Sequence, residues 1–554
     1  MAQTTPALER TVSITANNER LDIFLKKLSV ESGCVFSYSS NALDINRTVH
    51  GEFQNQTTRE ILETVFEGQV AIKPKGAYVI LTQAPRSKKE VMVSGYVVDE
   101  DSGDKISKAT VYNPVTLRSA TTDEFGYFQM KMKKPSPDDY KLIIKKLDYS
   151  DTVVVAPQKR SSFQRISLRL EREKINTIAN DIAKPAEKFW AWTKNSVGQI
   201  NQKNVRDSLH RTWQISFVPF IGTNRKMSAN VTNDFSVNLL GGYSAGTNKA
   251  ELGGLFNINT GNVKAVQLAG LFNLDGGWVK GLQVAGVTNI NNATTQGVQI
   301  SGFANINQDS VQSASIAGFA NINNLAVRGF QLAGFLNLAN GNVHGVQLSG
   351  FANIAGKEVE GVQIGFINIG KNIRGTQLGF INVAKTHRSA PIGFLSFVSK
   401  GYNSLELGAD EIIPFSISFR IGVRSFYNIL MAGARPERSD SATWSFGYGI
   451  GSSVIIGKSS FLNFELTAQQ IYKGNVEALN LFNRFYIGYE QKLGKALALY
   501  AGPAFTLRVF DTSYEQHPSS FRYYKPDILN EKFYPEKNLA SQLWLGFRFG
   551  LRLF

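Results

Sequence analysis

Polar and apolar residues alternate through the middle of the chain in a unit that recurs every 16 residues, as from Gln267 to Gln283. Between Val263 and Leu274, one alternate set holds small and amide side chains, and the other holds larger apolar ones. A period of two is typical of a β-strand, whose successive side chains point to opposite faces. Short turns rich in Gly, Asn and Asp separate the units. Each unit therefore predicts a strand of about ten to twelve residues, close to the length with which a tilted strand crosses a bilayer.

A short fixed period has two structural explanations. The units are hairpin strands of a membrane barrel, or they are coils of a parallel β-solenoid in which Asn and Gln ladders stack. The apolar set, which includes Val266, Leu268, Phe272 and Leu274, is continuous, and charges fall mainly at the turns. This pattern favours barrel strands, because the lipid-facing residues of such strands are apolar.

The polar set of the repeat supplies candidate site residues. Amide side chains that line a barrel lumen suit uncharged solutes, although hydrogen bonding between neighbouring strands explains their repetition equally well. The residues that we predict to face such a lumen are Gln267, Gln283, Gln299, Gln331, Gln347, Gln363, Asn273, Asn305 and Asn337.

The C-terminal part of the chain carries longer and more aromatic alternating segments. In the last of them, Phe547, Phe549 and Leu551 share one face. Helical signals are nearly absent from this region, and only helices and closed barrels satisfy all backbone polar groups within a bilayer. We therefore predict a mainly β fold in which residues 211–554, including the repeat array 248–400, form a transmembrane antiparallel β-barrel of roughly 16–20 strands.

The connections between the C-terminal segments alternate in length. The longer ones are 435–441, 473–480 and 510–541, and the shorter ones between them are 457–460 and 492–495. Outer-membrane barrels have long external loops and short periplasmic turns. This alternation therefore predicts that the first barrel strand begins, and the last one finishes, on the periplasmic side. The longest connection holds aromatic residues that we predict to bind an extracellular partner. They are Tyr514, Phe521, Tyr523, Tyr524, Phe533 and Tyr534.

Residues 11–83 have the pattern of a small α/β module. Short strand signals flank two amphipathic helices, of which the first runs from Leu21 to Leu28 and the second starts at Thr57 with Glu60 in the capping position. A strand, a helix, the segments SGCVFSYSS and VHGEFQNQTTREILETVFEG, and a closing AYVILTQ follow in an order that resembles the STN domain, the N-terminal module of secretins and TonB receptors. The resemblance implies a periplasmic location, where such modules dock onto partners or relay signals.

Residues 90–170 alternate through short strands separated by turn clusters. The positions that carry a family pattern are Gly95, Val97, Asp99, Gly103, Ala109, Thr110 and Val111, followed by the Thr122-Asp123-x-x-Gly126-x-Phe128 signature. They resemble the carboxypeptidase regulatory-like domain, which is common at the N-termini of outer-membrane proteins of Bacteroidota. The resemblance implies a non-catalytic seven-stranded sandwich in a protein of that origin.

Residues 171–210 predict a polar helical connector, which Pro185 divides. Phe189, Trp190 and Trp192 follow the proline. Because Trp favours membrane interfaces, these rings fit the inner rim of a barrel, and they fit equally well against the preceding domain.

Composition excludes several classes of protein. The chain has 554 residues and one cysteine, Cys34, which excludes an internal disulfide and any Cys-based zinc site. The net charge of +16 is not accompanied by a nucleic-acid motif, so we expect no nucleic-acid partner. Because Met1 leads directly into polar residues and an outer-membrane protein needs a secretory signal, we expect that the signal has been removed.

No catalytic constellation emerges from the motifs: there is no nucleophile elbow, no phosphate-binding Gly loop and no metal-ligand spacing. We therefore predict a non-enzymatic protein of the cell outer membrane, without cofactor or metal and with periplasmic N-terminal domains. The favoured function is a structural or docking subunit of a multi-protein complex for assembly, secretion or transport. Its expected partners are outer-membrane lipid, outer-membrane or periplasmic proteins, and surface lipoproteins. A channel for small uncharged solutes is the alternative; a TonB-dependent receptor fits less well, because the connector is too short to form a plug domain.

Overall fold

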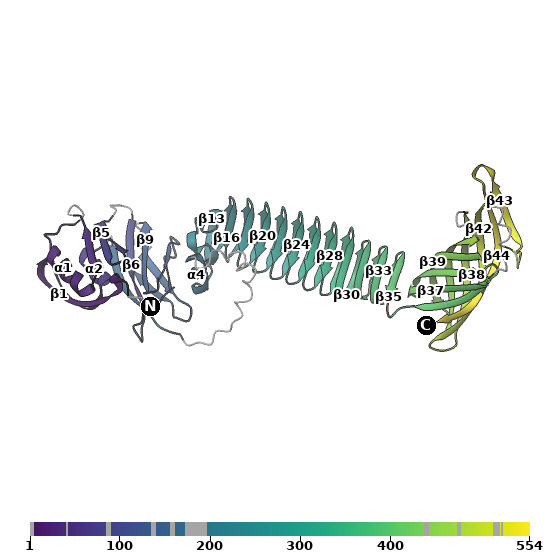
Figure 1. Cartoon of the computed structure of the whole chain (residues 1–554), viewed down its shortest axis with the longest axis horizontal. Helices are drawn as coiled ribbons and strands as arrows, with labels where there is room; N and C mark the ends of the chain where they lie inside the picture. The colour runs from purple at the N-terminus through teal and green to yellow at the C-terminus, as the bar shows by residue number, and fades with distance from the viewer. Residues whose placement is uncertain are drawn as a thin grey trace. The chain divides into compact units, whose positions relative to one another are not determined.

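The computed structural model of the chain forms two compact units, Met1–Gly270 with Leu274–Gly277 and Leu271–Asn273 with Trp278–Phe554. It describes residues 5–39, 43–84, 90–133, 140–155, 161–171, 197–436, 443–473, 478–513, 521 and 524–554. Strands dominate both units (Figure 1), which confirms the predicted mainly β class. Among the described helices, none is long and apolar enough to cross a membrane.

The N-terminal module packs two helices against two small sheets. Its elements are η1 (Ala7–Glu9), β1 (Thr11–Arg20), α1 (Leu21–Ser32), β2 (Val35–Tyr38), β3 (Thr48–Thr57), α2 (Thr58–Phe66), β4 (Val70–Lys75) and β5 (Tyr78–Gln83). The sheets have the orders β1-β3 and β2-β5-β4. α1 contributes Phe24 to the core and α2 contributes Ile61. The predicted helix cap is present: the Glu60 amide donates to Thr57 Oγ1 at 3.1 Å, and the Thr57 amide donates to Glu60 Oε2 at 2.8 Å.

A β-sandwich of seven described strands follows. They are β6 (Glu90–Asp99), β7 (Thr110–Tyr112), β8 (Ser119–Thr121), β9 (Tyr127–Lys133), β10 (Lys141–Lys145), β11 (Thr152–Val155) and β12 (Ser161–Leu168). One sheet has the order β11-β10-β7-β8 and the other β12-β6-β9. The signature segment forms the turn into β9: Thr122 Oγ1 donates to the Ile106 carbonyl at 2.7 Å, and Asp123 Oδ1 accepts from the Tyr127 amide at 2.9 Å. Gly126 has a φ of +71°, a left-handed conformation that favours glycine.

The sandwich packs on the start of a parallel β-solenoid within the first unit. Tyr112 and Leu117 share a core with Val205, Met227 and Val231. The elements there are α4 (Val197–Asn204), β13 (Leu209–Val218), β14 (Ile221–Gly222), η5 (Arg225–Asn230), β15 (Val231–Asn238), β16 (Gly241–Ser244), β17 (Gly246–Gly253), β18 (Phe256–Asn259) and β19 (Val263–Ala269), with β20 (Phe272–Asp275) at the boundary of the two units. α4 lies in the predicted connector 171–210, whereas Pro185, Phe189, Trp190 and Trp192 lie outside the described residues.

Coils of the same build occupy the first part of the second unit. Their strands are β21 (Val279–Ala285), β22 (Thr288–Asn291), β23 (Thr295–Ser301), β24 (Ala304–Asn307), β25 (Val311–Ala317), β26 (Ala320–Asn323), β27 (Val327–Ala333), β28 (Leu336–Ala339), β29 (Val343–Ser349), β30 (Ala352–Ile364), β31 (Ile367–Ile373), β32 (Thr376–Leu378), β33 (Ile381–His387), β34 (Pro391–Ile392) and β35 (Leu395–Val398). Parallel pairing places each residue beside its equivalent in the next coil, as in Gln283 beside Gln299 and Asn289 beside Asn305. The repeat array therefore does not supply barrel strands.

Each repeat unit is two strands joined at a corner, not one long strand. In one 16-residue repeat, the first strand ends at Ala269 and the second strand begins at Phe272. Leu271 belongs to the same alternate set as Gln267 and Asn273, yet it is 43% exposed whereas both amides are fully buried. The alternation continues through the corner without a change of phase, so the sequence pattern resembled a single strand of bilayer length. The first strand has seven residues, fewer than the roughly 9–11 of a membrane-spanning strand.

Glycine is required at the corner because successive coils approach each other closely. A Cβ atom on Gly302 would overlap the carbonyl oxygen of Gly286, and one on Gly318 would overlap that of Gly302. The glycine of the repeat therefore sets the spacing of the coils as well as the bend.

The predicted antiparallel β-barrel is confirmed for the C-terminal part, but eight strands close it instead of roughly 16–20. They are β36 (Ser404–Asp410), β37 (Phe415–Val423), β38 (Phe426–Arg435), β39 (Thr443–Ile455), β40 (Ser460–Lys473), β41 (Asn480–Lys492), β42 (Leu497–Asp511) and β44 (Leu539–Leu553). β36 pairs with β44 through Leu405 and Leu553, which closes the sheet. β43 (Ile528–Tyr534), followed by η7 (Pro535–Lys537), adds a further strand along β44. The estimate was too high because it counted the repeats as barrel strands.

Candidate functional site

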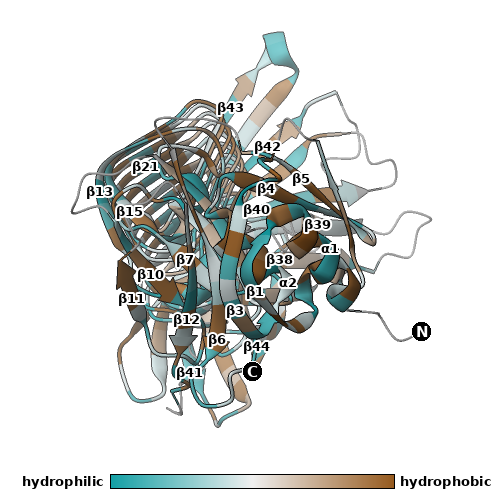
Figure 2. Cartoon of the chain, turned by 90° about the vertical axis from the view of Figure 1, so that its left-hand side faces the viewer, coloured by the Kyte–Doolittle hydropathy of each residue, from teal (hydrophilic) through white to brown (hydrophobic). Residues whose placement is uncertain are grey.

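The outer surface of the barrel is apolar along every long strand. On β44, Leu545, Phe547 and Phe549 are 51–54% exposed, and Arg548 between them is buried. Residues of the same kind on the other strands are Ile417, Phe419, Phe446, Leu466, Phe485, Leu499, Phe505 and Leu507. The alternation of hydrophobic and hydrophilic residues along individual strands is visible in Figure 2. Monomeric soluble proteins rarely expose an apolar surface of this extent, whereas membrane barrels have an outward apolar band.

Two arginines and two glutamates form a closed cluster inside the barrel. Arg420 contacts Glu406 at 2.6 Å and Glu465 at 2.9 Å. Arg552 contacts the same two carboxylates, Glu406 at 2.8 Å and Glu465 at 3.0 Å. All four side chains have no exposed surface. Each charge therefore has at least two opposite charges beside it, which is the arrangement that buried ions need to offset their lost hydration.

Further charged and aromatic side chains extend this cluster along the barrel. Glu490 contacts Arg552 at 2.6 Å and Arg424 at 2.9 Å. Tyr427 donates to Glu465 at 3.0 Å, and the guanidinium of Arg552 lies 4.6 Å from the centre of the Tyr500 ring. Barrels of eight strands have interiors that side chains are able to fill, and these buried side chains occupy the interior of this one.

The charged cluster is a structural arrangement of mutually paired groups. Among the described residues, no three His, Cys, Asp or Glu side chains are grouped so as to hold a metal ion.

The amides that we predicted to face a lumen are instead fully buried inside the solenoid coils. Asn289 donates to Asn305 at 2.9 Å, and Asn305 donates to Asn321 at 2.9 Å. Gln299 donates to Gln283 at 2.8 Å in a parallel ladder. Ser315 interrupts the glutamine ladder, which resumes with Gln331, Gln347 and Gln363. Asn337 continues the asparagine ladder. The 16-residue period stacks identical amides on one another, which explains their repetition without any solute.

Two buried carboxylates occupy ladder positions in the coils of the first unit, and we did not predict them as site residues. Glu251 stands where later coils have Gln, and Asp275 stands where they have Asn. Gln267 Nε2 lies 3.1 Å from Glu251 Oε2 and 3.0 Å from Asp275 Oδ1, and Asn259 Nδ2 lies 2.7 Å and 2.9 Å from the same atoms. Burial raises the pKa of Glu251, while hydrogen bonds from Asn259, Gln267 and Asn238 oppose the rise. The detectable signal in the sequence was an acid at a position that is otherwise an amide.

The aromatic residues predicted for the partner loop divide into two groups. Phe521 packs against the buried Trp544, with ring centroids 5.5 Å apart. Tyr524, Phe533 and Tyr534 are exposed. Tyr514 and Tyr523 lie outside the described residues.

A polar junction connects the N-terminal module to the sandwich. The Tyr96 hydroxyl donates to Glu9 Oε2 at 2.6 Å, and Arg59 Nε lies 2.8 Å from Glu9 Oε1. The Arg59 guanidinium lies 4.0 Å from the centre of the Tyr127 ring. Burial raises the pKa of Tyr127 to about 12. Buried and mutually paired groups of this kind hold the two modules together as one platform.

Comparison with known proteins identifies one part of the chain. Residues 93–178 match the CarboxypepD_reg-like domain family, which agrees with the sandwich and its signature turn. No curated protein and no solved structure matches the chain.

Proposed function

We propose that this protein is a non-enzymatic docking subunit of an outer-membrane complex, anchored in the membrane by its C-terminal barrel. The observation that carries the proposal is the inversion of polarity across the barrel wall. Apolar side chains such as Phe547 cover the outside, whereas buried ion pairs such as Arg552 with Glu406 fill the inside. An anchor requires the first property, and the second leaves little room for a solute.

The lengths of the barrel connections support a periplasmic position for the solenoid and the N-terminal modules. Leu405 at the start of β36 pairs with Leu553 at the end of β44, so the solenoid enters the barrel at the end where the chain stops. Short turns at 424–425, 456–459 and 493–496 share that end. The connections at the opposite end include the longest one, which carries β43. This asymmetry is typical of outer-membrane barrels, whose short turns are periplasmic.

The N-terminal platform supplies the docking surfaces of the proposal. The first module resembles the STN domain in the order of its elements, and domains of that kind dock onto periplasmic partners or relay signals. The sandwich is of a kind common in outer-membrane proteins of Bacteroidota, which is the origin we propose. On the external side, the exposed Tyr524, Phe533 and Tyr534 offer a surface to a lipoprotein or a neighbouring membrane protein.

A channel for small uncharged solutes is the weaker candidate. Its main support was the row of amides, and these hydrogen-bond to one another inside the coils. A TonB-dependent receptor is weaker still, because an eight-stranded barrel is far smaller than the 22-stranded barrels of outer-membrane transporters.

The proposal is tested by extracting the tagged full chain from native outer membranes in mild detergent and identifying the proteins that stay bound through size exclusion. A variant that lacks residues 1–84 is the comparison, because the sandwich packs on the solenoid and has to remain. We expect a stoichiometric partner that is lost with the N-terminal module. A second variant, Phe533→Ser with Tyr534→Ser, separates external partners from periplasmic ones. A full chain that elutes alone contradicts the docking function.

A further inference from the structure

The solenoid coils of the second unit carry rows of apolar residues on their outer faces as well as in their interior. Their interior holds amide ladders beside buried aliphatic residues such as Val343 and Val359, and further rows of apolar residues lie on the outer faces, half-buried or exposed. One row consists of Ile290, Ile306, Ile322, Leu338, Ile354, Ile369, Val383 and Phe397, and the other of Val284, Ile300, Ile316, Leu332, Leu348, Ile364, Leu378 and Ile392. Such apolar outer faces need a non-aqueous environment or a partner.

Aromatic rings form a row along one edge of these coils, which we call the Phe edge. It consists of Phe303, Phe319, Phe335, Phe351, Phe366, Phe380 and Phe394. The ring centroids lie 4.8–6.1 Å apart, with interplanar angles of 1–16°. Each ring nevertheless remains 39–51% exposed, so stacking does not remove the Phe edge from its surroundings.

The opposite edge of the coils carries all the charge, and we call it the charged edge. Between Trp278 and Tyr402 the chain has eight Lys or Arg residues and three acidic ones, all in or next to the turns at this edge. They are Lys280, Asp309, Arg328, Lys357, Glu358, Glu360, Lys371, Arg374, Lys385, Arg388 and Lys400. The coils are therefore amphipathic, with an apolar edge and a basic edge.

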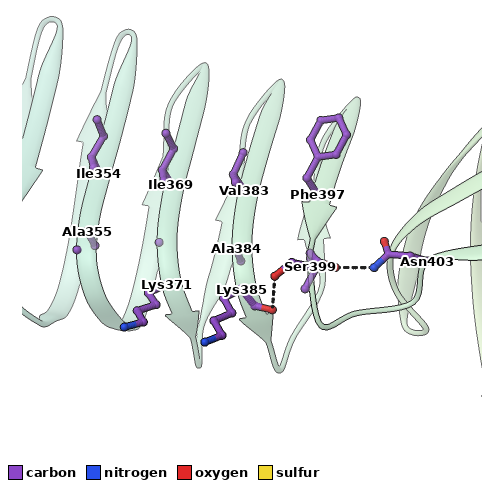
Figure 3. Close-up of a pocket in the computed structure, with 13 residues that line it drawn as sticks. Ile354, Ala355, Ile369, Lys371, Val383, Ala384, Lys385, Phe397, Ser399 and Asn403 are labelled. Carbon is purple, nitrogen blue, oxygen red and sulfur yellow. Dashed lines mark hydrogen bonds between the residues drawn. The ribbon is translucent and has the colours of Figure 1, made fainter.

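A groove in the last coils shows both properties together. It has a volume of about 810 Å³ and its lining includes Ile369, Val383 and Phe397. Figure 3 shows these side chains in a row across successive coils, with Lys371 and Lys385 toward the charged edge. An acyl chain suits the apolar row, and a lipid phosphate suits the ammonium groups.

The Phe edge continues onto the outer surface of the barrel. Phe394 stacks on Tyr448 of β39, with ring centroids 4.4 Å apart. Tyr448 lies near the middle of its strand, in the same alternate set as the exposed Trp444 and Phe446. Asn428 Nδ2 of the barrel donates to the Gly393 carbonyl at 2.8 Å beside this stack. One apolar surface therefore extends from the barrel wall along the coils.

We propose that the Phe edge is immersed in the hydrocarbon of one leaflet of the bilayer that the barrel spans, with the charged edge at the lipid headgroups. The distance from Phe366 to Lys371 is five residues of extended chain, or about 17 Å, which is close to half of a hydrocarbon core of about 30 Å. The solenoid then lies along the membrane surface as an amphipathic wedge, by the principle that holds for interfacial helices. This inference rests on the proposed membrane location of the barrel.

The test uses the full chain in vesicles of phosphatidylethanolamine and phosphatidylglycerol, with nitroxides on single cysteines in a Cys34→Ser background. Phe335→Cys reports the Phe edge, Asn340→Cys reports the charged edge of the same coil, and Phe549→Cys reports the barrel surface. Val287 occupies the Phe335 position in an earlier coil, so a non-aromatic side chain is tolerated there. The measurement is the ratio of collision rates with oxygen, which enters lipid, and with a nickel chelate, which stays in water.

We expect a high ratio at positions 335 and 549 and a low ratio at 340. A high ratio at 549 with a low ratio at 335 overturns the immersion of the Phe edge and leaves the barrel anchor intact. Low collision rates with both reagents at 335 indicate a covering protein surface and likewise overturn it. A low ratio at 549 refutes the membrane location of the barrel, and with it the proposed function.

Discussion

His387 replaces the aliphatic residue that the preceding coils have at the equivalent buried position. Val343, Val359 and Ile373 occupy the equivalent position in the preceding coils and are buried. His387 Nδ1 lies 2.8 Å from the Ser389 carbonyl oxygen, whereas Nε2 has no hydrogen-bond partner among the described residues. Burial lowers the pKa of His387 from 6.5 to about 4. The imidazole is therefore held neutral in the folded coil.

Replacing His387 by Ile should stabilise the last coils and remove their sensitivity to acid. The pKa of His387 is lower in the folded coil than in the unfolded chain. The free energy of unfolding is therefore highest above pH 6.5, falls as the pH drops, and stops falling once the pH is below the folded pKa of about 4. The free energy of unfolding falls by about 3 kcal/mol over this range, because one pKa unit corresponds to about 1.4 kcal/mol. Hydrogen exchange of peptides 376–398, corrected for intrinsic rates between pH 4 and 7, measures it. Equal pH dependence in His387→Ile and the unmodified chain contradicts the assignment.

At the scale of the element, each coil depends on amide ladders that only a repeated sequence is able to form. Asn321 Nδ2 donates to Asn337 Oδ1 at 2.9 Å and to the Leu332 carbonyl at 2.9 Å, while its Oδ1 accepts from Asn305. Asn321 thus hydrogen-bonds with its equivalents in the coils on both sides. A single substitution leaves buried groups unpaired in two adjoining coils.

Asn321→Leu should therefore destabilise the coils by about 2–5 kcal/mol, since each buried polar group left unpaired costs about 1–3 kcal/mol. Asn340→Ala is the matched control, because Asn340 is exposed and makes one amide contact with Asn324 at 3.2 Å. The control should change stability by less than about 0.5 kcal/mol. Hydrogen exchange in the coils flanking residue 321 distinguishes them. Similar protection of the amide hydrogens in both variants would contradict the claim that the asparagine ladder stabilises the coils.

The sequence predicted strands, turns and period in the repeat, yet not how the strands associate. Alternation has the same phase on both sides of the corner at Leu271, so the pattern alone did not distinguish one long strand from two short ones. The decisive feature was the glycine of the corner, Gly302 in one coil, which permits a close approach of backbones that hairpins do not require. The Thr57 cap was predictable because both partners lie within four residues of sequence.

At the scale of the whole molecule, the site was less predictable than the fold. The cluster in the barrel joins Glu406 to Arg552, which are 146 residues apart, and no local pattern connects two positions at such a distance. Once the strands alternate, the sequence shows which residues point inward. Their pairing depends on the strand number and on closure of the sheet, which the 16-residue repeat obscured.

The closed cluster predicts that the barrel is an anchor that does not conduct. Arg420, Glu406, Glu465 and Arg552 are fully buried and contact one another across the interior, so ions would have to displace them to pass. This distinguishes the docking subunit from a solute channel more directly than any binding measurement.

The most direct test is therefore single-channel conductance of the full chain in a planar bilayer. Flotation with lipid vesicles and protection of the barrel from protease first establish that the protein has inserted. The docking account predicts no ohmic steps above the bare-membrane current after insertion. Stable open steps from the inserted, unmodified chain would contradict the filled barrel and establish the channel as the better account.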